Sequence, residues 1–399
     1  MSTDGASSPL RFVTRGWRRV DGRPAATRRA IGARLRHSNA YLAWSDADTP
    51  RQIVPTARPD VARWVRRTFE PWARRKLDAA TWSALRAGSL VVGEGPGLAQ
   101  LGAEEALGRS LDGAVLGCVS ASGHVQAKLL CFVFERGERE PSVVVKGIPL
   151  EGEGSRLLAE ASAVAAIRKL LSGATAAALP PEPVWAGDVG GHDVVVVEPV
   201  DPLAGATGHE DRDAALGWLA RLQDETAHDE WGTDADLASL DEVLEFASSE
   251  SGLGAGALRT MWREQWDDLG RTTIPRCAVH GDFWRGNLAV DGLRLRVYDW
   301  EWAALSGHPL FDPWTYELAA LRGRAESPHE VAAALADACR RVEAQLEGRG
   351  LDRRLARAFL LPAAADIAYR VRRVRGTPPD HEERARALLA GAARLVSGG

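Results

Sequence analysis

The feature that most constrains the fold of this chain is a block at 280–287, HGDFWRGN, which is followed by Asp299-Trp300-Glu301. Phosphoryl transfer to a hydroxyl needs a carboxylate that orients the hydroxyl and accepts its proton, and oxygen ligands that hold Mg²⁺. Asp282 and Asn287, five positions apart, with Asp299 shortly after, supply these groups. The structural alternative is a capped turn. A chance match of four fixed residue types occurs in well under ~1% of chains of this length, so the block favours phosphotransferase chemistry.

The order of the predicted elements favours a two-lobed fold. Residues 114–123, 125–135 and 142–148 predict three strands, with a turn at 137–140. A helix is expected over 155–171, and the apolar run at 192–200 is typical of a buried strand. Beyond residue 201 the pattern is mostly helical, apart from a turn-rich block at 277–301. We therefore expect an α+β, bilobal, protein-kinase-like fold with a small β-rich N-lobe and a larger helical C-lobe.

Residues 1–100 differ in composition from the rest of the chain. They are rich in Arg, Ala and Trp with helical spacing, as in VARWVRRTFEPWARRKL, and Gly and Pro residues at 93–97 mark a boundary. We expect three parts. They are a basic helical N-terminal extension at 1–100, a nucleotide-binding N-lobe with its hinge at 101–200, and a C-lobe at 201–399 that carries the catalytic loop, metal site and acceptor site.

A lysine and a glutamate in the predicted N-lobe each need a partner of opposite charge. Lys146 ends the apolar strand VVVK, where an unpaired ammonium would be costly. Glu160 shares a helical face with apolar residues, among them Leu157 and Val164, and needs a cation. Kinases pair a strand lysine with a helix glutamate to hold the nucleotide phosphates. We favour Lys146–Glu160; the alternatives are Lys128 or an arginine as the partner, or a solvated Glu160.

The block HGDFWRGN…YDWEWA resembles the aminoglycoside phosphotransferase / choline kinase family of protein-kinase-like small-molecule kinases. The resemblance covers roughly 105–330. It implies that Asp282 is the catalytic base, that Asn287 and Asp299 ligate Mg²⁺, and that His280 braces the loop. Glu301, in the D-x-E motif, and Asp312, in the segment HPLFDPWTYELAAL, are expected to support the site.

The resemblance also implies where the nucleotide and the acceptor bind. Small residues at 117–123 suit phosphate oxygens, although a plain hairpin turn fits them nearly as well. The run at 194–200 would be the hinge whose backbone holds the base. Tryptophans near the catalytic block are either core residues or a substrate wall. The candidate residues are Ser120, Ser122 and Gly123 for phosphates, Glu198 and Val200 for the base, and Trp284, Arg285 and Trp302 for the acceptor.

The formal net charge of −4 conceals a strong asymmetry. Residues 1–100 have a net charge of +10, whereas residues 201–270 have a net charge of −13. The basic extension could dock on the acidic segment, the acidic segment could receive a cationic substrate, or both could be solvated faces. Nucleic-acid binding is disfavoured, because the arginines are dispersed and no recognised motif is present.

Other classes of protein are disfavoured. No run of 18 apolar residues occurs, the N-terminus lacks an apolar signal region, and the four cysteines form no metal-ligand pattern. We therefore expect reduced cysteines, a cytoplasmic location, no membrane partner, and a monomer or homodimer. Walker A, G-x-S-x-G, H-E-x-x-H and Rossmann patterns are also missing.

Together these observations predict an Mg²⁺-dependent O-phosphotransferase that uses ATP, with GTP possible. The predicted acceptor is a small molecule with a hydroxyl group, with an aminoglycoside or another antibiotic favoured by the acidic segment. The alternatives are a sugar or nucleoside kinase in a carbohydrate or natural-product pathway, and a nucleotide-binding pseudokinase.

Overall fold

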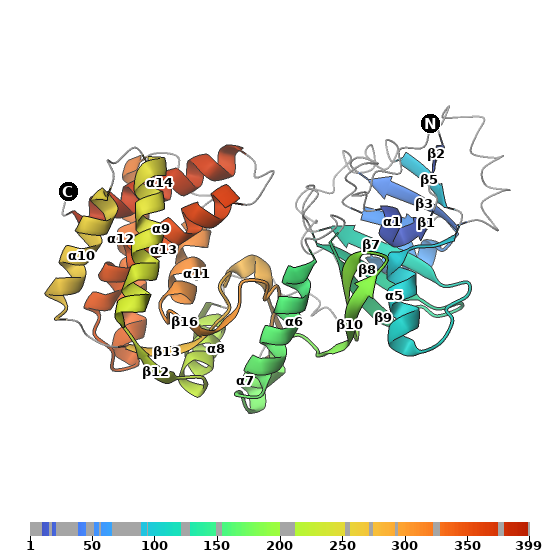
Figure 1. Ribbon diagram of the computed structural model, residues 1–399, viewed down its shortest axis with the longest axis horizontal. Helices are drawn as coiled ribbons and strands as arrows, with labels where there is room; N and C mark the ends of the chain where they lie inside the picture. Colours follow the sequence, from blue (N-terminus) through green and yellow to red (C-terminus); the bar gives the residue numbers. More distant parts are fainter. Residues whose placement is uncertain are drawn as a thin grey trace. The chain divides into compact units, whose positions relative to one another are not determined.

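The computed structural model divides into two compact units (Figure 1). Unit 1 consists of Met1–Ala165 and Pro180–Thr207, and unit 2 of Ala166–Leu179 and Gly208–Gly399. The structure describes residues 10–15, 18–20, 39–44, 52–55, 57–65, 89–93, 95–120, 128–148, 154–199, 212–251, 256–270, 274–291, 294–321, 328–373 and 379–397.

Unit 1 is built on a sheet of nine strands in the order β10-β11-β9-β8-β7-β4-β3-β5-β2, and every neighbouring pair is antiparallel. In chain order the strands are β2 (Arg18–Val20), β3 (Asn39–Trp44), β4 (Gln52–Pro55), β5 (Ser89–Gly93), β7 (Val115–Ser120), β8 (Leu129–Phe134), β9 (Val143–Gly147), β10 (Pro183–Val189) and β11 (His192–Val197). A short helix, α1 (Leu10–Val13), leads into a small separate sheet of β1 (Thr14–Arg15) and β6 (Gly95–Pro96).

Both faces of the nine-stranded sheet are covered, as the alternation of side chains requires. In β9, Val143 and Val145 belong to one buried cluster, together with Ala99 and Ala103 of α5 (Leu98–Leu107). Val144 belongs to a second cluster on the other face, with residues of a helix at 59–65 and of α6 (Ser155–Arg168). Lys146 is two positions after Val144, so its side chain projects toward α6.

The described parts of 1–100 differ from the predicted helical extension. The segment at 59–65 is helical, as expected, but β2, β3, β4 and β5 are strands. They extend the N-lobe sheet, because Gln52 and Ile53 pair with Val119 and Cys118 of β7. Valine, isoleucine and aromatic residues favour a pleated, half-buried surface, and strand pairing outweighs the helical tendency of Arg and Ala here. Most of the motif at 61–77 lies outside the described residues.

Unit 2 is mainly helical, and its core lies between long helices. The helices are α7 (Gly173–Ala177), α8 (Arg212–Glu225), α9 (Asp234–Ser251), α10 (Ala257–Asp268), α11 (Phe311–Leu321), α12 (Pro328–Gly348), α13 (Arg354–Arg373) and α14 (Pro379–Val396). Their apolar faces include four buried tryptophans, such as Trp262 and Trp266 of α10. None of the helices in the described ranges is both long and apolar enough to span a membrane.

Short strands in unit 2 position the block at 280–301. They are β12 (His228–Trp231), β13 (Ile274–Val279), β14 (Leu288–Asp291), β15 (Arg294–Val297) and β16 (Ala304–Gly307). The three N-lobe strands, the helix at 155–171, the buried strand and the C-lobe helices are confirmed, and so is the α+β bilobal fold class. The sequence did not predict β13, which leads directly into His280.

Candidate active site

In unit 1, one buried carboxylate binds two lysines. Glu160 of α6 is 4% exposed, and its Oε1 accepts a hydrogen bond from Lys146 Nζ at 3.1 Å. Its Oε2 accepts one from Lys128 Nζ at 2.8 Å. The predicted Lys146–Glu160 pair is therefore present, and Lys128, considered as an alternative partner, is a second partner. Two cations on one carboxylate leave a local net positive charge, which suits a phosphate group.

Two opposing effects act on the pKa of Glu160. Burial raises this pKa, because it disfavours the charged form. The charges and hydrogen bonds of Lys146 and Lys128 outweigh burial and hold the pKa at about 2, below the ordinary value of 4.5. Glu160 is therefore ionised at neutral pH, and both lysines remain positioned near the sheet.

In unit 2, the turn that follows β13 requires glycine at position 281. Gly281 has a φ of +80°, and a Cβ there would collide with the carbonyl oxygen of Trp302. The same turn is held by a buried carboxylate of α11. Asp312, which is fully buried, accepts hydrogen bonds from the backbone N–H groups of His280 at 2.6 Å and Gly281 at 2.8 Å. Burial raises the pKa of Asp312 to about 6, although these hydrogen bonds and Arg370 lower it.

His280 connects the loop to the end of β15. The backbone N–H of Asp282 donates to His280 Nδ1 at 3.2 Å, so this nitrogen is the acceptor. The other nitrogen, Nε2, lies 2.8 Å from the carbonyl oxygen of Tyr298 and therefore donates to it. The imidazole is neutral in this arrangement and bridges residue 282 to the residue before Asp299. This placement is consistent with the bracing role that the sequence suggested.

Asn287 fixes the side chain of Asp282. Its Nδ2 donates to both the carbonyl oxygen and the carboxylate Oδ2 of Asp282, at 2.9 and 3.0 Å. A carbonyl oxygen only accepts, so the amide nitrogen must face Asp282 and the amide oxygen must point away. That oxygen accepts no hydrogen bond from any residue in the described ranges. An amide oxygen of this kind is a suitable ligand for Mg²⁺.

Asp299 lies beside Asn287 through strand pairing. The β14–β15 ladder pairs Leu288 with Val297, and the N–H of Tyr298 then donates to the carbonyl oxygen of Asn287 at 2.8 Å. Asp299, the next residue, has a φ of +67°, a conformation that is unusual for a residue other than glycine. Such strained conformations concentrate at functional sites. The side chains of Asn287 and Asp299 carry the types of oxygen donor that could hold a divalent cation.

Sequence reasoning missed Arg370, a residue of α13 that contacts the loop at 280–287. Its guanidinium donates to the carbonyl oxygen of Gly281 and forms an ion pair with Asp366 at 2.7 Å. It also lies over the ring of Trp302, 4.9 Å from the centroid. Trp302 therefore packs against this arginine. Because 370 lies 83 residues after the end of the block HGDFWRGN, no local motif points to it.

The remaining predicted site residues vary in how the structure places them. Ser120 ends β7, and Glu198 is exposed just after β11.

Trp284 and Glu301 are partly buried, and the Trp284 ring packs against Gly286 of its own loop. Arg285 is exposed, with its guanidinium 6.0 Å from the Tyr316 ring centroid. Ser122, Gly123 and Val200 lie outside the described residues.

Arginines of unit 2 neutralise part of the acidic segment. Asp236 pairs with Arg276 at 2.5 Å, and Asp241 pairs with Arg263. Two further carboxylates, Asp224 and Glu245, also have arginine partners within unit 2. The acidic segment is therefore less negative in its surroundings than its composition suggests.

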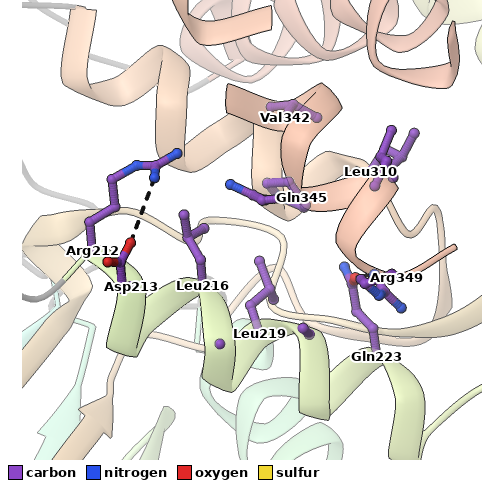
Figure 2. A pocket seen from close by; sticks show the side chains of 13 residues that line it. Arg212, Asp213, Leu216, Leu219, Gln223, Leu310, Val342, Gln345 and Arg349 are labelled. Carbon is purple, nitrogen blue, oxygen red and sulfur yellow. Dashed lines mark hydrogen bonds and ion pairs between the residues drawn. The ribbon is translucent and has the colours of Figure 1, made fainter. Parts of the chain in front are cut away.

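A pocket of about 240 Å³ lies in unit 2 between α8, the start of α11 and α12 (Figure 2). Two buried donors in its lining, Gln345 Nε2 and Arg349 Nε, have no hydrogen-bond partner among the residues that the structure describes. None of the predicted catalytic or metal residues lines this pocket. A different face of α8 presents Trp218 to the loop at 280–287, where its ring stacks on that of Phe283 with the ring centroids 5.8 Å apart.

Two features define a protein-kinase-like class of protein. Unit 1 has a nine-stranded sheet and a buried lysine–glutamate pair, and unit 2 is helical and carries an H-G-D-x-x-x-x-N loop. A family model narrows this class. The model of the phosphotransferase enzyme family matches residues 132–351, which is more than half of the chain. The chain belongs to this family, and it is a small-molecule phosphotransferase. The resemblance found in the sequence is thereby confirmed.

Solved structures with similar folds share little sequence with this chain. Aminoglycoside phosphotransferase APH(4)-Ia is 16% identical, with a TM-score of 0.47 and coverage of 74% of this chain and 98% of that one. A fructosamine-3-kinase homologue from Thermobifida fusca is also 16% identical, with a TM-score of 0.45 and coverage of 72% and 96%. Macrolide 2'-phosphotransferase MphH from Brachybacterium faecium is 18% identical, with a TM-score of 0.41 and coverage of 69% and 93%. No curated protein matches the sequence.

Proposed function

We propose that this enzyme transfers the γ-phosphoryl group of ATP or GTP to a hydroxyl of an aminoglycoside or another antibiotic. The observation that carries the proposal is the hydrogen bonding of Asn287. Its amide nitrogen holds the Asp282 carboxylate, and its amide oxygen stays available for a cation. One side chain thus links the proposed base to the proposed metal site.

Each residue has a distinct role in this proposal. The carboxylate of Asp282 orients the acceptor hydroxyl and takes its proton as the oxygen attacks phosphorus. Lys146 binds phosphate oxygens of the nucleotide, and Glu160 holds that lysine in position. Asn287 and Asp299 would hold Mg²⁺, which when bound neutralises charge on the phosphates. Positioning and charge neutralisation then supply most of the rate enhancement.

The remaining negative charge of the acidic segment supports a cationic acceptor. Asp229 and Glu230 of β12 are exposed, and neither makes an ion pair with a residue that the structure describes. Exposed carboxylates attract ammonium groups and raise the rate at which a cationic ligand arrives. An aminoglycoside carries several such groups.

A neutral sugar or nucleoside is the second candidate acceptor. Four carboxylates of the acidic segment, among them Asp236 and Asp241, have arginine partners in unit 2. Because these arginines neutralise the carboxylates, the negative electrostatic field that attracts a cationic acceptor would be weaker. A sugar binds mainly through hydrogen bonds and aromatic stacking, for which this charge is not needed.

A transfer assay distinguishes the two candidates. The purified enzyme would be incubated with Mg²⁺ and either ATP or GTP. The acceptors would be aminoglycosides, peptide and nucleoside antibiotics, and free sugars, with phosphoryl gain detected by mass spectrometry. We expect gain on a cationic antibiotic. Gain only on a neutral sugar or nucleoside would support the second candidate, and nucleotide binding without transfer to any acceptor would contradict both.

A further inference from the structure

Two cysteines that are 13 positions apart in the sequence lie directly opposite each other in the unit 1 sheet. Cys118 of β7 pairs in register with Cys131 of β8. Both side chains are fully buried, and their sulfur atoms lie 2.6 Å apart. Both are free thiols in the structure. The spacing of these cysteines in the sequence did not indicate that they are neighbours in the fold.

The backbone geometry of this pair suits a covalent bond. Opposite residues on antiparallel strands have Cα atoms about 4.5–5.5 Å apart. Disulfides span Cα separations of about 4.4–6.8 Å. An S–S bond between Cys118 and Cys131 therefore needs little movement of β7 or β8.

The surroundings determine when such a bond can form. Tyr41 of β3, which is 3% exposed, lies beside both thiols, and its own pKa is raised by burial and by their proximity. Burial raises the pKa of the Cys118 thiol well above its ordinary value, so the reactive thiolate is scarce in the closed sheet. Thiol–disulfide exchange at Cys118 therefore requires that the β7–β8 hairpin opens, or it takes place during folding, before the sheet has formed.

We propose that Cys118 and Cys131 are an oxidative modification site that forms a cross-strand disulfide by reaction with a small-molecule disulfide. One thiolate attacks the small disulfide, giving a mixed disulfide and releasing one small thiol. The second cysteine then displaces the other small thiol. Two S–H bonds of the protein and one S–S bond of the reagent break. One protein S–S bond forms, and the protons pass to the two released thiols.

The crosslink would fasten one particular hairpin. Cys118 lies two residues before Ser120, which ends β7. A bond to Cys131 would close a loop through the hairpin and limit the separation of β7 from β8. A crosslinked loop restricts the unfolded chain, so oxidation should stabilise unit 1.

The test uses the full-length enzyme and oxidised glutathione as the small disulfide. The chain would be refolded from denaturant, or held in mild denaturant, with and without oxidised glutathione. Remaining thiols would then be alkylated and peptides mapped by mass spectrometry. We expect two of the four cysteines to escape alkylation, a mass loss of about 2 Da per chain, and a crosslinked peptide containing Cys118 and Cys131. Dithiothreitol should reverse all three changes.

Alanine variants of single cysteines show which two residues form the disulfide. Cys277 and Cys339 of unit 2 are also buried, and burial raises their pKa values to about 12. Cys277→Ala should leave the mass loss unchanged, whereas Cys118→Ala and Cys131→Ala should each abolish it. If an alanine variant fails to fold, the peptide map of the wild-type enzyme still decides. Four alkylated cysteines after refolding with oxidised glutathione, or a crosslink that involves Cys277 or Cys339, would overturn the proposal.

Discussion

At the scale of single residues, Glu160 shows how two opposing effects set the state of a carboxylate. Burial alone would favour its neutral form, but Lys146 and Lys128 hold it ionised, with a pKa of about 2. An acid whose pKa is lower in the folded state contributes stability above its unfolded pKa, here about 4.5. That contribution is lost as the pH falls from about 4.5 toward 2.

Replacing Glu160 by Gln should therefore lower stability at neutral pH and flatten its dependence on pH in acid. We expect a loss of about 3 kcal/mol at pH 7, because two lysines lose their buried partner. Chemical denaturation at a series of pH values between 7 and 2 measures both effects. Glu105→Gln, at an exposed position of α5, is the control. A variant as stable as the control at pH 7 would show that the pair contributes little.

Gly281 is a second residue with a specific requirement. Gly281→Ala should cost about 2 kcal/mol or more, since the new Cβ meets a backbone oxygen at a positive φ. Displacing this turn should also reduce phosphoryl transfer at least tenfold. Gly348→Ala is the matched control, because a Cβ there meets no atom within 4 Å. Thermal unfolding and transfer assays on both variants test the prediction, and equal behaviour of the two would contradict it.

At the scale of elements, helix α13 contacts the loop at 280–287 from outside it. Arg370 contacts the carbonyl oxygen of Gly281, while Asp366 and the Trp302 ring hold the arginine in place. An element far along the chain thus contributes a contact to the loop at 280–287. Its role depends on packing between α13 and the loop.

Removing this support should slow the chemical step and leave nucleotide binding nearly intact. For Arg370→Ala we expect kcat to fall about tenfold while the Kd for nucleotide changes little, because the loop loses orientation. Arg354→Ala, in the same helix with a side chain that is 61% exposed, should leave both constants unchanged. An equal loss of kcat in both variants, or an unchanged kcat in Arg370→Ala, would exclude a positioning role for Arg370.

Elements with a regular pattern or a local motif could be predicted from the sequence. The valine-rich strands β9 and β11 and the helices of unit 2 follow directly from hydrophobic periodicity. The loop motif placed Asp282 and Asn287 in one turn, but it did not predict the hydrogen bonds between them. Arg370, the simultaneous binding of Glu160 by Lys128 and Lys146, and the Cys118–Cys131 pair could not be predicted, since each depends on tertiary pairing between distant segments.

At the scale of the whole chain, the described strands of the N-terminal hundred residues belong to the architecture of unit 1. Strands β2 to β5 extend the sheet past β7, and the pairing of Ile53 with Cys118 joins the two parts. The composition of these residues indicated a separate segment, but backbone hydrogen bonds between β4 and β7 join their strands to the N-lobe sheet. Their contribution is therefore structural as well as electrostatic.

Deleting residues 25–95 should leave β7 as an unpaired edge strand. Exposed edges and the uncovered apolar side chains of β7 promote association between chains. We expect the truncated protein to aggregate, or to unfold at a clearly lower temperature than the full chain. Size-exclusion chromatography and thermal unfolding followed by circular dichroism are suitable measurements. A monodisperse truncated protein with an unchanged Tm would contradict this account.

The proposed function depends on Asp282 as the base of the phosphoryl transfer. The most direct test compares wild-type enzyme and Asp282→Asn for phosphoryl transfer to the acceptor identified by mass spectrometry, with nucleotide affinity measured in parallel. Loss of the base should reduce kcat by about 100-fold or more, with the Kd for nucleotide largely unchanged. Near-normal turnover in Asp282→Asn would show that another group accepts the proton and would contradict the assignment.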